Sequence, residues 1–227
     1  NAASITIELF SDQNADIVIR MPTGAGVGAG PFHSQSNEAW FFHTPGLKIV
    51  YPSTPYYAKG LLNSAIADTD PYLFFEHKYL YRSLTEEIPD DYYNVEVGKG
   101  RYASRGDEIT IITYGMGVHW ALAIMKEYKE NQIEIIDMYS LLPWDKEIIK
   151  ESLEKTGKVL ILHEDTLTGG IGAEWSAWIN EHCFESLDAP VFRVASLDSP
   201  VPFAPNLERN FLPVERLKVK LAELMEY

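Results

Sequence analysis

The chain has 227 residues, of which 46% are hydrophobic, enough for one large or two small domains with a sizeable core. Its formal net charge of −14 argues against binding to nucleic acid or anionic membranes, and no apolar run is long enough to span a bilayer. Cys183 is the single cysteine, so the chain can form neither an internal disulfide nor a cysteine cluster for zinc, which favours a reducing compartment.

Strands and a helix alternate in the first part of the chain. Runs of β-branched and apolar residues predict strands over 15–20, 47–51 and 72–76. Ser53-Thr54-Pro55 predicts the start of a helix, because a hydroxyl can cap its first turn and proline fits its first position. The helix is expected to end at Asp68-Thr-Asp70-Pro71. These elements are too few to close a sheet, so we expect an incomplete domain and a chain that is a piece of a longer polypeptide.

The regular pattern is lost over residues 79–106, which predicts a linker or crossing segment, and returns from Asp107. There the expected strands are 109–114, 133–138, 158–163 and 191–194, and the expected helices are 118–128, 145–155, a segment opened by 168–172, and 213–226. Continuous apolar strands that alternate with helices predict an α/β fold, in which a mostly parallel sheet carries helices on both faces.

A glycine-rich segment is the main candidate for function. Gly24, Gly26, Gly28 and Gly30 alternate with small residues, and His33 follows at the start of an apolar helical run. Glycine lets the backbone pass close to a bound molecule, and an imidazole at the exit of such a loop could donate or accept a proton. The alternative is a surface loop followed by a structural histidine. The glycine spacing does not match the dinucleotide fingerprint.

The other histidines give weaker signals. His77 and His163 each end a predicted strand beside a glutamate, and we expect structural hydrogen bonds for both. No pair of histidines has the spacing typical of a metal site. The turn at Thr168-Gly-Gly lies between a strand and a helix, where it either holds an anion or only reverses the chain.

Several short motifs occur in the same order along this chain as in a known protein family. The set consists of His33-Ser-Gln-Ser-Asn-Glu38-Ala, Pro45-Gly-Leu-Lys-Ile-Val, Pro52-Ser-Thr-Pro, Ala58-Lys-Gly-Leu-Leu, Phe75-Glu-His-Lys, Pro143-Trp-Asp145, His163-Glu, Leu167-Thr-Gly-Gly170 and Ala189-Pro-Val. Together they resemble the beta subunit of the thiamine-diphosphate-dependent 2-oxoacid dehydrogenases, most of all the branched-chain (2-oxoisovalerate) type and next the pyruvate type.

The resemblance implies a domain organisation. Residues 1–90 would be the latter, incomplete part of a transketolase-like pyrimidine-binding domain, 91–106 a linker, and 107–227 a transketolase C-terminal-like domain. In such enzymes an alpha-type subunit supplies the site for the diphosphate and magnesium. The family's glutamate that activates the cofactor matches no residue of this chain.

The resemblance also implies an activity. It is the oxidative decarboxylation of a 2-oxo acid, branched-chain in the first instance, with acyl transfer to lipoamide, and the chain is expected to be inactive alone. His33 matches the family's catalytic histidine. A structural potassium site would involve Ala65, Asp68 and Asp70, although a capped turn explains these residues equally well.

The implied partners are an alpha-type subunit, a second beta region and the lipoyl-bearing acyltransferase core, whose basic domain would suit the negative charge. The implied location is bacterial cytoplasm or, in a eukaryote, the mitochondrial matrix. Three alternatives stay open, namely a pyruvate dehydrogenase beta subunit, another transketolase-like thiamine enzyme, and a non-catalytic assembly module.

Overall fold

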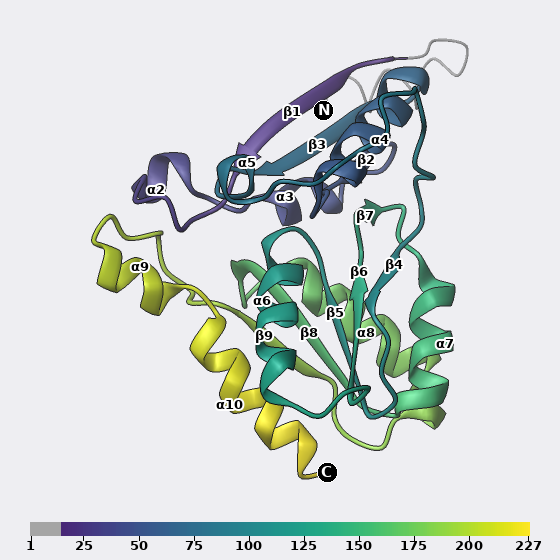
Figure 1. The fold of residues 1–227 in the computed structure, drawn as a ribbon, viewed down its shortest axis with the longest axis vertical. Helices are drawn as coiled ribbons and strands as arrows, with labels where there is room; N and C mark the ends of the chain where they lie inside the picture. Colours follow the sequence, from purple (N-terminus) through teal and green to yellow (C-terminus); the bar gives the residue numbers. More distant parts are fainter. Residues whose placement is uncertain (1–14) are drawn as a thin grey trace.

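Two sheets organise residues 15–227, the part of the chain that the computed structural model describes (Figure 1). The first sheet has the strand order β1-β3-β2-β7 and the second has the order β4-β6-β5-β8-β9. The strands are β1 Val18–Thr23, β2 Lys48–Val50, β3 Tyr72–His77, β4 Arg101–Ser104, β5 Ile109–Thr113, β6 Ile133–Asp137, β7 Ser140–Leu142, β8 Val159–Thr166 and β9 Phe192–Ser196.

The helices cover these sheets and connect their strands. They are α2 Gly30–His33, α3 Glu38–Phe42, α4 Pro55–Ala67, α5 Leu80–Ser83, α6 Met116–Ile124, α7 Lys146–Thr156, α8 Ile171–His182, α9 Pro205–Phe211 and α10 Val214–Met225, with short 3-10 turns at Met125–Glu127 and Phe184–Ser186. None of these helices, over residues 15–227, is both long and apolar enough to cross a membrane.

The second sheet confirms the prediction of a mostly parallel sheet between two helical layers. Strands β6, β5, β8 and β9 run parallel, and only β4 is antiparallel to its neighbour. Alternate residues of β5 face opposite sides: Ile111 packs in the cluster under α6 and α10, and Ile112 packs in the cluster under α7 and α8. A strand buried on both faces must be apolar along its whole length, which explains the continuous apolar runs of the sequence.

The predicted helix signals are present as well. Thr54 caps α4 by accepting a hydrogen bond from the amide of Tyr57, and Pro55 is its first residue. Asp145 caps α7, which ends at Gly157 in the left-handed conformation with φ of 64°. These boundaries depend on short-range backbone chemistry, so they could be recognised in the sequence.

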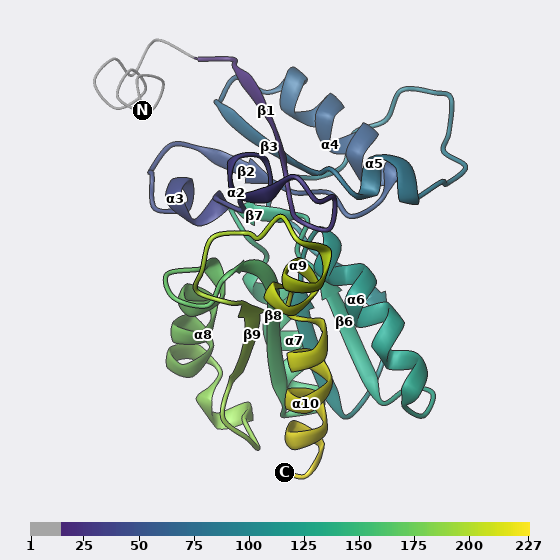
Figure 2. The ribbon, with the colours of Figure 1, turned by 90° about the vertical axis from the view of Figure 1, so that its left-hand side faces the viewer.

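The first sheet is completed by a strand from the second part of the chain. Strand β7 pairs antiparallel with β2, so residues 140–142 join a sheet that otherwise comes from residues 18–77 (Figure 2). Helix α4 covers one face of this sheet. The opposite face, with Ile49 and Phe75, belongs to one buried cluster that also contains Tyr114 and Trp175 of the second part. The two sheets therefore share a core, which we call the shared core.

Several short elements differ from the sequence prediction, among them helices α2 and α5, which were not predicted. Strand β4 lies within residues 91–106, which were predicted as a linker, while the domain boundaries themselves stay a prediction. Strand β7 and helix α9 were not predicted at all. These segments are short, and their packing partners are distant in sequence, so local periodicity carries little information about them. The first 14 residues of the predicted domain 1–90 lie outside the described part of the chain.

Candidate functional site

The glycine-rich segment is a tight passage between the two parts of the molecule. Gly24, Gly26, Gly28 and Gly30 all have positive φ, from 63° to 96°, a region that other residues rarely adopt. A Cβ atom at Gly24 would lie 2.2 Å from Nε2 of His77, at the end of β3. A Cβ at Gly30 would lie 2.3 Å from the ring of Phe203, just before α9. The segment, residues 24–30, is called the glycine loop below.

His33 stands at the exit of this loop, at the last position of α2, and it is exposed. Figure 2 shows α2 next to α9, at the boundary between the upper and the lower part of the molecule. The ring is therefore not sealed inside the core, and it can reach a molecule bound at that boundary. The hydroxyls of Ser34 and Ser36, which follow it, are buried and have no hydrogen-bond partner among residues 15–227.

His77 and Glu164 form a buried pair across the two parts. Nε2 of His77 donates to Oε2 of Glu164 at 2.6 Å, and the amide of Ala25 donates to Oε1 of the same carboxylate, also at 2.6 Å. Burial raises the pKa of Glu164, but His77 and the Ala25 amide outweigh it, and the pKa lies below its ordinary value. The expected structural hydrogen bond of His77 is thus confirmed, and its partner belongs to β8.

His163 also has the structural role that the sequence predicted. Its Nδ1 donates to the carbonyl oxygen of Asp165 at 3.2 Å, and complete burial lowers its pKa to about 4. The ring lies against the start of α8, where a Cβ atom at Gly170 or Gly172 would come within 2.7 Å of it. At neutral pH the imidazole is uncharged, which suits the positive end of a helix.

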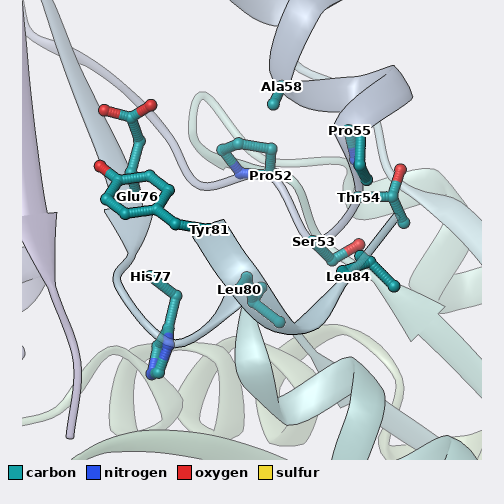
Figure 3. A pocket seen from close by; sticks show the side chains of 10 residues that line it. All are labelled: Pro52, Ser53, Thr54, Pro55, Ala58, Glu76, His77, Leu80, Tyr81 and Leu84. Carbon is teal, nitrogen blue, oxygen red and sulfur yellow. The ribbon is translucent and has the colours of Figure 1, made fainter. Parts of the chain in front are cut away.

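Two cavities adjoin His77 and Glu164. The first cavity has a volume of about 210 Å³ and lies between the end of β3, the start of α4, and α5. Glu76, His77 and Tyr81 all line it, but the side chain of His77 points away from those of Glu76 and Tyr81 (Figure 3). Successive strand residues point to opposite faces, so Glu76 instead accepts hydrogen bonds from Arg20 at 2.6 and 2.9 Å. The second cavity, about 270 Å³, is lined by Ser34, Ser36 and Trp40 on one side and by residues of β8 on the other.

A buried acidic cluster lies behind the second cavity. Glu38 is completely buried, accepts a hydrogen bond from the hydroxyl of Tyr114 at 2.6 Å, and has its pKa raised to about 8 by burial and by the charge of Asp165. The pKa of Asp165 is raised to about 6, by burial and by Glu164. Glu38 therefore keeps its proton at neutral pH, because burial disfavours its charged form and the charge of Asp165 adds to this effect.

The predicted potassium ligands are placed as follows. Ala65 is buried within α4, Asp68 ends that helix, and Asp70 follows in the turn. The ammonium group of Lys48 forms ion pairs with both carboxylates, and the hydroxyl of Tyr72 donates to Asp68. These contacts explain the capped turn and supply a cation from the chain itself. The assignment of potassium ligands stays a prediction.

The Thr168 turn holds a carboxylate of the chain. Its amide donates to Oδ1 of Asp198 at 3.0 Å, and its hydroxyl donates to Oδ2 at 2.6 Å. Over residues 15–227 no group of three or more His, Cys, Asp or Glu side chains is arranged to hold a metal ion. The side chains of residues 15–227 therefore do not fit a bound magnesium ion, and the catalytic role of His33 stays a prediction.

Sequence reasoning missed two residues of this region. Glu208 on α9 accepts hydrogen bonds from the amides of Gly26 and Gly28, and Glu38 supplies the buried carboxyl group. Pro205 at the first position of α9 could have indicated that helix. For Glu38, the signal was a single acidic residue at the head of the apolar run 39–42.

Comparisons with known proteins now give the family. Residues 1–83 match the transketolase pyrimidine binding domain, and residues 98–216 match the transketolase C-terminal domain. The split gene transketolase, inactive beta4 tetramer, has a similar fold with a TM-score of 0.73, at 22% identity over 98% of this chain and 71% of that chain.

Three curated relatives are more similar in sequence. The 2-oxoisovalerate dehydrogenase subunit beta of Bacillus subtilis (strain 168) is 46% identical over 230 residues, which cover 100% of this chain and 70% of that protein. The mitochondrial 2-oxoisovalerate dehydrogenase subunit beta of Dictyostelium discoideum is 43% identical over 89% of the chain and 57% of that protein. The pyruvate dehydrogenase E1 component subunit beta of Bacillus subtilis is 43% identical over 87% of the chain and 61% of that protein.

The chain thus spans between 57% and 70% of the length of these relatives. The match covers both domains, and the α/β fold agrees with it. The chain belongs to the family of 2-oxoacid dehydrogenase beta subunits, with transketolase-type pyrimidine-binding and C-terminal domains.

Proposed function

We propose that the chain is the beta-type part of the decarboxylating component of a 2-oxoacid dehydrogenase complex, which oxidatively decarboxylates a branched-chain 2-oxo acid and transfers the acyl group to lipoamide. One observation carries the proposal: the matched histidine, His33, is exposed at the exit of the glycine loop, where the two parts of the molecule meet. A histidine kept for packing alone would be buried like His163.

The chemistry of His33 suits the acyl-transfer step. Thiamine diphosphate, when bound, supplies the electron sink for loss of carbon dioxide from the 2-oxo acid. Acyl transfer then opens the lipoyl disulfide, and the departing sulfur needs a proton that a positioned imidazole can donate. The buried pair of His77 and Glu164 is not accessible for that task, since both side chains are at most 6% exposed.

The proposal includes partners that complete the site. An alpha-type subunit would hold the diphosphate and magnesium, and a lipoyl-bearing acyltransferase core would present the lipoyl group. A second beta region would pair with this chain. The assembly would act in bacterial cytoplasm or in the mitochondrial matrix. On this proposal the chain alone binds thiamine diphosphate weakly and has no activity, and the ratio of rates with branched 2-oxo acids and with pyruvate identifies the substrate.

The test uses His33→Ala in the chain assembled with its alpha-type partner. Decarboxylation is followed with an artificial electron acceptor, and lipoyl acylation is followed separately. We expect acylation to slow by about 100-fold or more, in line with loss of a general acid, while decarboxylation changes much less. His43→Ala is the control, because His43 is also exposed and lies just after α3. Equal losses in both half-reactions would contradict the role given to His33.

A further inference from the structure

Helix α9 of the second part holds the glycine loop through a carboxylate. Oε1 of Glu208 accepts hydrogen bonds from the amide of Gly26 at 2.8 Å and from the amide of Gly28 at 3.2 Å. Its Oε2 lies at the same distance, 3.2 Å, from the Gly28 nitrogen, so the single N–H of Gly28 is shared between the two carboxylate oxygens. Backbone amides that converge in this way form a concave site for an anion, and here the anion is a side chain of the same chain.

Glu208 is buried, so its carboxylate depends on the hydrogen bonds from the loop. Glu208 is 5% exposed, and among residues 15–227 it forms no ion pair. Lys78 is the basic group whose charge acts on it, but the Lys78 ammonium makes no hydrogen bond in the described part of the chain. A buried carboxylate without its hydrogen bonds is costly, so Glu208 and the loop amides each need the other to stay in place.

The contact bears directly on His33. Phe203, in the segment that leads into α9, fills the space beside Gly30, the first residue of α2. Glu208 and Phe203 thus fix the loop at Gly26, Gly28 and Gly30, and His33 follows three residues later. On the other side, Glu164 fixes Ala25. Every one of these contacts comes from the second part of the molecule.

We infer that Glu208 is a positioning residue, which sets the orientation of His33 through the glycine loop and thereby the rate of acyl transfer. The effect on the acyl-transfer rate rests on the proposed function. The effect of Glu208 on the conformation of the loop does not depend on that function. A small displacement of a general acid reduces the rate of proton transfer far more than it reduces substrate binding. The KM for the 2-oxo acid should therefore stay constant while the acylation rate falls.

The experiment compares Glu208→Ala, Glu208→Gln and Glu215→Gln in the chain assembled with its alpha-type partner. Glutamine keeps a neutral oxygen acceptor for the loop amides. Glu215 is exposed on α10, so its replacement removes the same charge without touching the loop. Two quantities are measured, namely amide hydrogen exchange over residues 24–33 and the rates of the two half-reactions.

We expect Glu208→Ala to raise exchange over 24–33 and to slow lipoyl acylation by about tenfold or more, with decarboxylation almost unchanged. Glu208→Gln should show the same changes at about one third of the size, and it decides the question if the alanine variant does not fold. Glu215→Gln should match the unmodified chain. Unchanged exchange, or equal losses in both half-reactions, would overturn the inference. If the unmodified assembly lacked decarboxylase activity, the proposed function would fail, while the exchange data would still decide the positioning role.

Discussion

At the scale of single residues, the seam between the two parts is built from glycines and carboxyl groups. The glycines let the loop pass within van der Waals distance of His77 and Phe203, and the carboxylates of Glu164 and Glu208 satisfy its amides. Phe203, Glu164 and Glu208 come from the second part of the chain, whereas His77 belongs to the first part together with the loop. Substitutions here should therefore have effects that the immediate sequence does not suggest.

The first prediction concerns Gly24. Alanine at this position would place its Cβ 2.2 Å from His77 in a backbone with φ of 96°. Gly28 has φ of 67° but open space around it. Gly28→Ala should therefore lower the free energy of unfolding only by the cost of placing alanine in the left-handed conformation, about 1–2 kcal/mol. We expect Gly24→Ala to lower the free energy of unfolding by at least about 2 kcal/mol more than Gly28→Ala, because packing around His77 must also shift. Urea denaturation measures both, and equal losses would show that the contact with His77 relaxes freely.

The second prediction concerns pH and Glu38. Its pKa in the folded chain, about 8, lies above the ordinary value of 4.5, so between these values the folded state holds a proton that the unfolded state releases. The contribution of Glu38 to the free energy of unfolding is therefore complete below pH 4.5, where the carboxyl group is protonated in both states. It decreases as the pH rises and is lost above about pH 8, where the carboxyl group is ionised in both states. Asp165 acts in the same direction up to a pH of about 6.

Glu38→Gln tests this assignment, because glutamine accepts the hydrogen bond of Tyr114 without titrating. The free energy of unfolding of the unmodified chain should fall with pH more steeply than that of Glu38→Gln, by about 1 kcal/mol per pH unit at most. The measurement is denaturant unfolding at several pH values between 5 and 8. Parallel pH profiles would mean that Glu38 is already ionised at pH 5.

At the scale of elements, strands β4 and β7 connect the two parts. β7 adds an antiparallel edge to the first sheet, and β4 brings Arg101 to the loop that follows β2. Nε of Arg101 donates to Oδ2 of the buried Asp137 at 2.9 Å, and the hydroxyl of Ser53 donates to the same oxygen. The pair fixes the end of β6 against the start of α4.

The third prediction is that Arg101→Met destabilises the chain by about 3 kcal/mol, because it leaves the Asp137 carboxylate buried with only Ser53 as a side-chain partner. The double variant Arg101→Met with Asp137→Asn should lose clearly less, since no uncompensated charge remains. Denaturation midpoints of the two variants give the comparison. If the double variant were as unstable as the single one, packing rather than charge would explain the effect.

At the scale of the whole molecule, the shared core makes the two parts one cooperative unit. Ile49 and Phe75 of the first sheet pack with Tyr114 and Trp175 of the second part, and Leu141 of β7 is completely buried in the same cluster. A chain of two domains with separate cores would unfold in two steps. Here the loss of either part exposes apolar surface of the other.

The fourth prediction is a single unfolding transition, with coincident far-ultraviolet circular dichroism and tryptophan fluorescence. Leu141→Ala should lower the free energy of unfolding by about 3 kcal/mol and shift both signals together. Leu217→Ala, in the cluster under α10, is the matched control within the second part. Leu217→Ala should also shift the circular dichroism and fluorescence signals together, as one transition. Separate transitions in either variant would show that the shared core does not couple the two parts.

The sequence by itself determined the family, the α/β class, the parallel strands of the second sheet and the caps of α4 and α7. These features depend on residues that are neighbours along the chain: alternation of apolar runs, a hydroxyl before a proline, a glycine after a helix. It also identified His77 and His163 as structural histidines, since each closes a strand predicted from the sequence, whereas the catalytic role of His33 stays a prediction.

Only the tertiary structure decided that β7 joins the first sheet, that Glu164 and Glu208 hold the glycine loop, and that Glu38 is buried beside Asp165. Each of these contacts joins residues that are more than 80 positions apart, and a short strand or a lone glutamate carries no local sign of its distant partner. The physical reason is that burial and charge pairing are properties of the packed chain, whereas periodicity and capping belong to the segment.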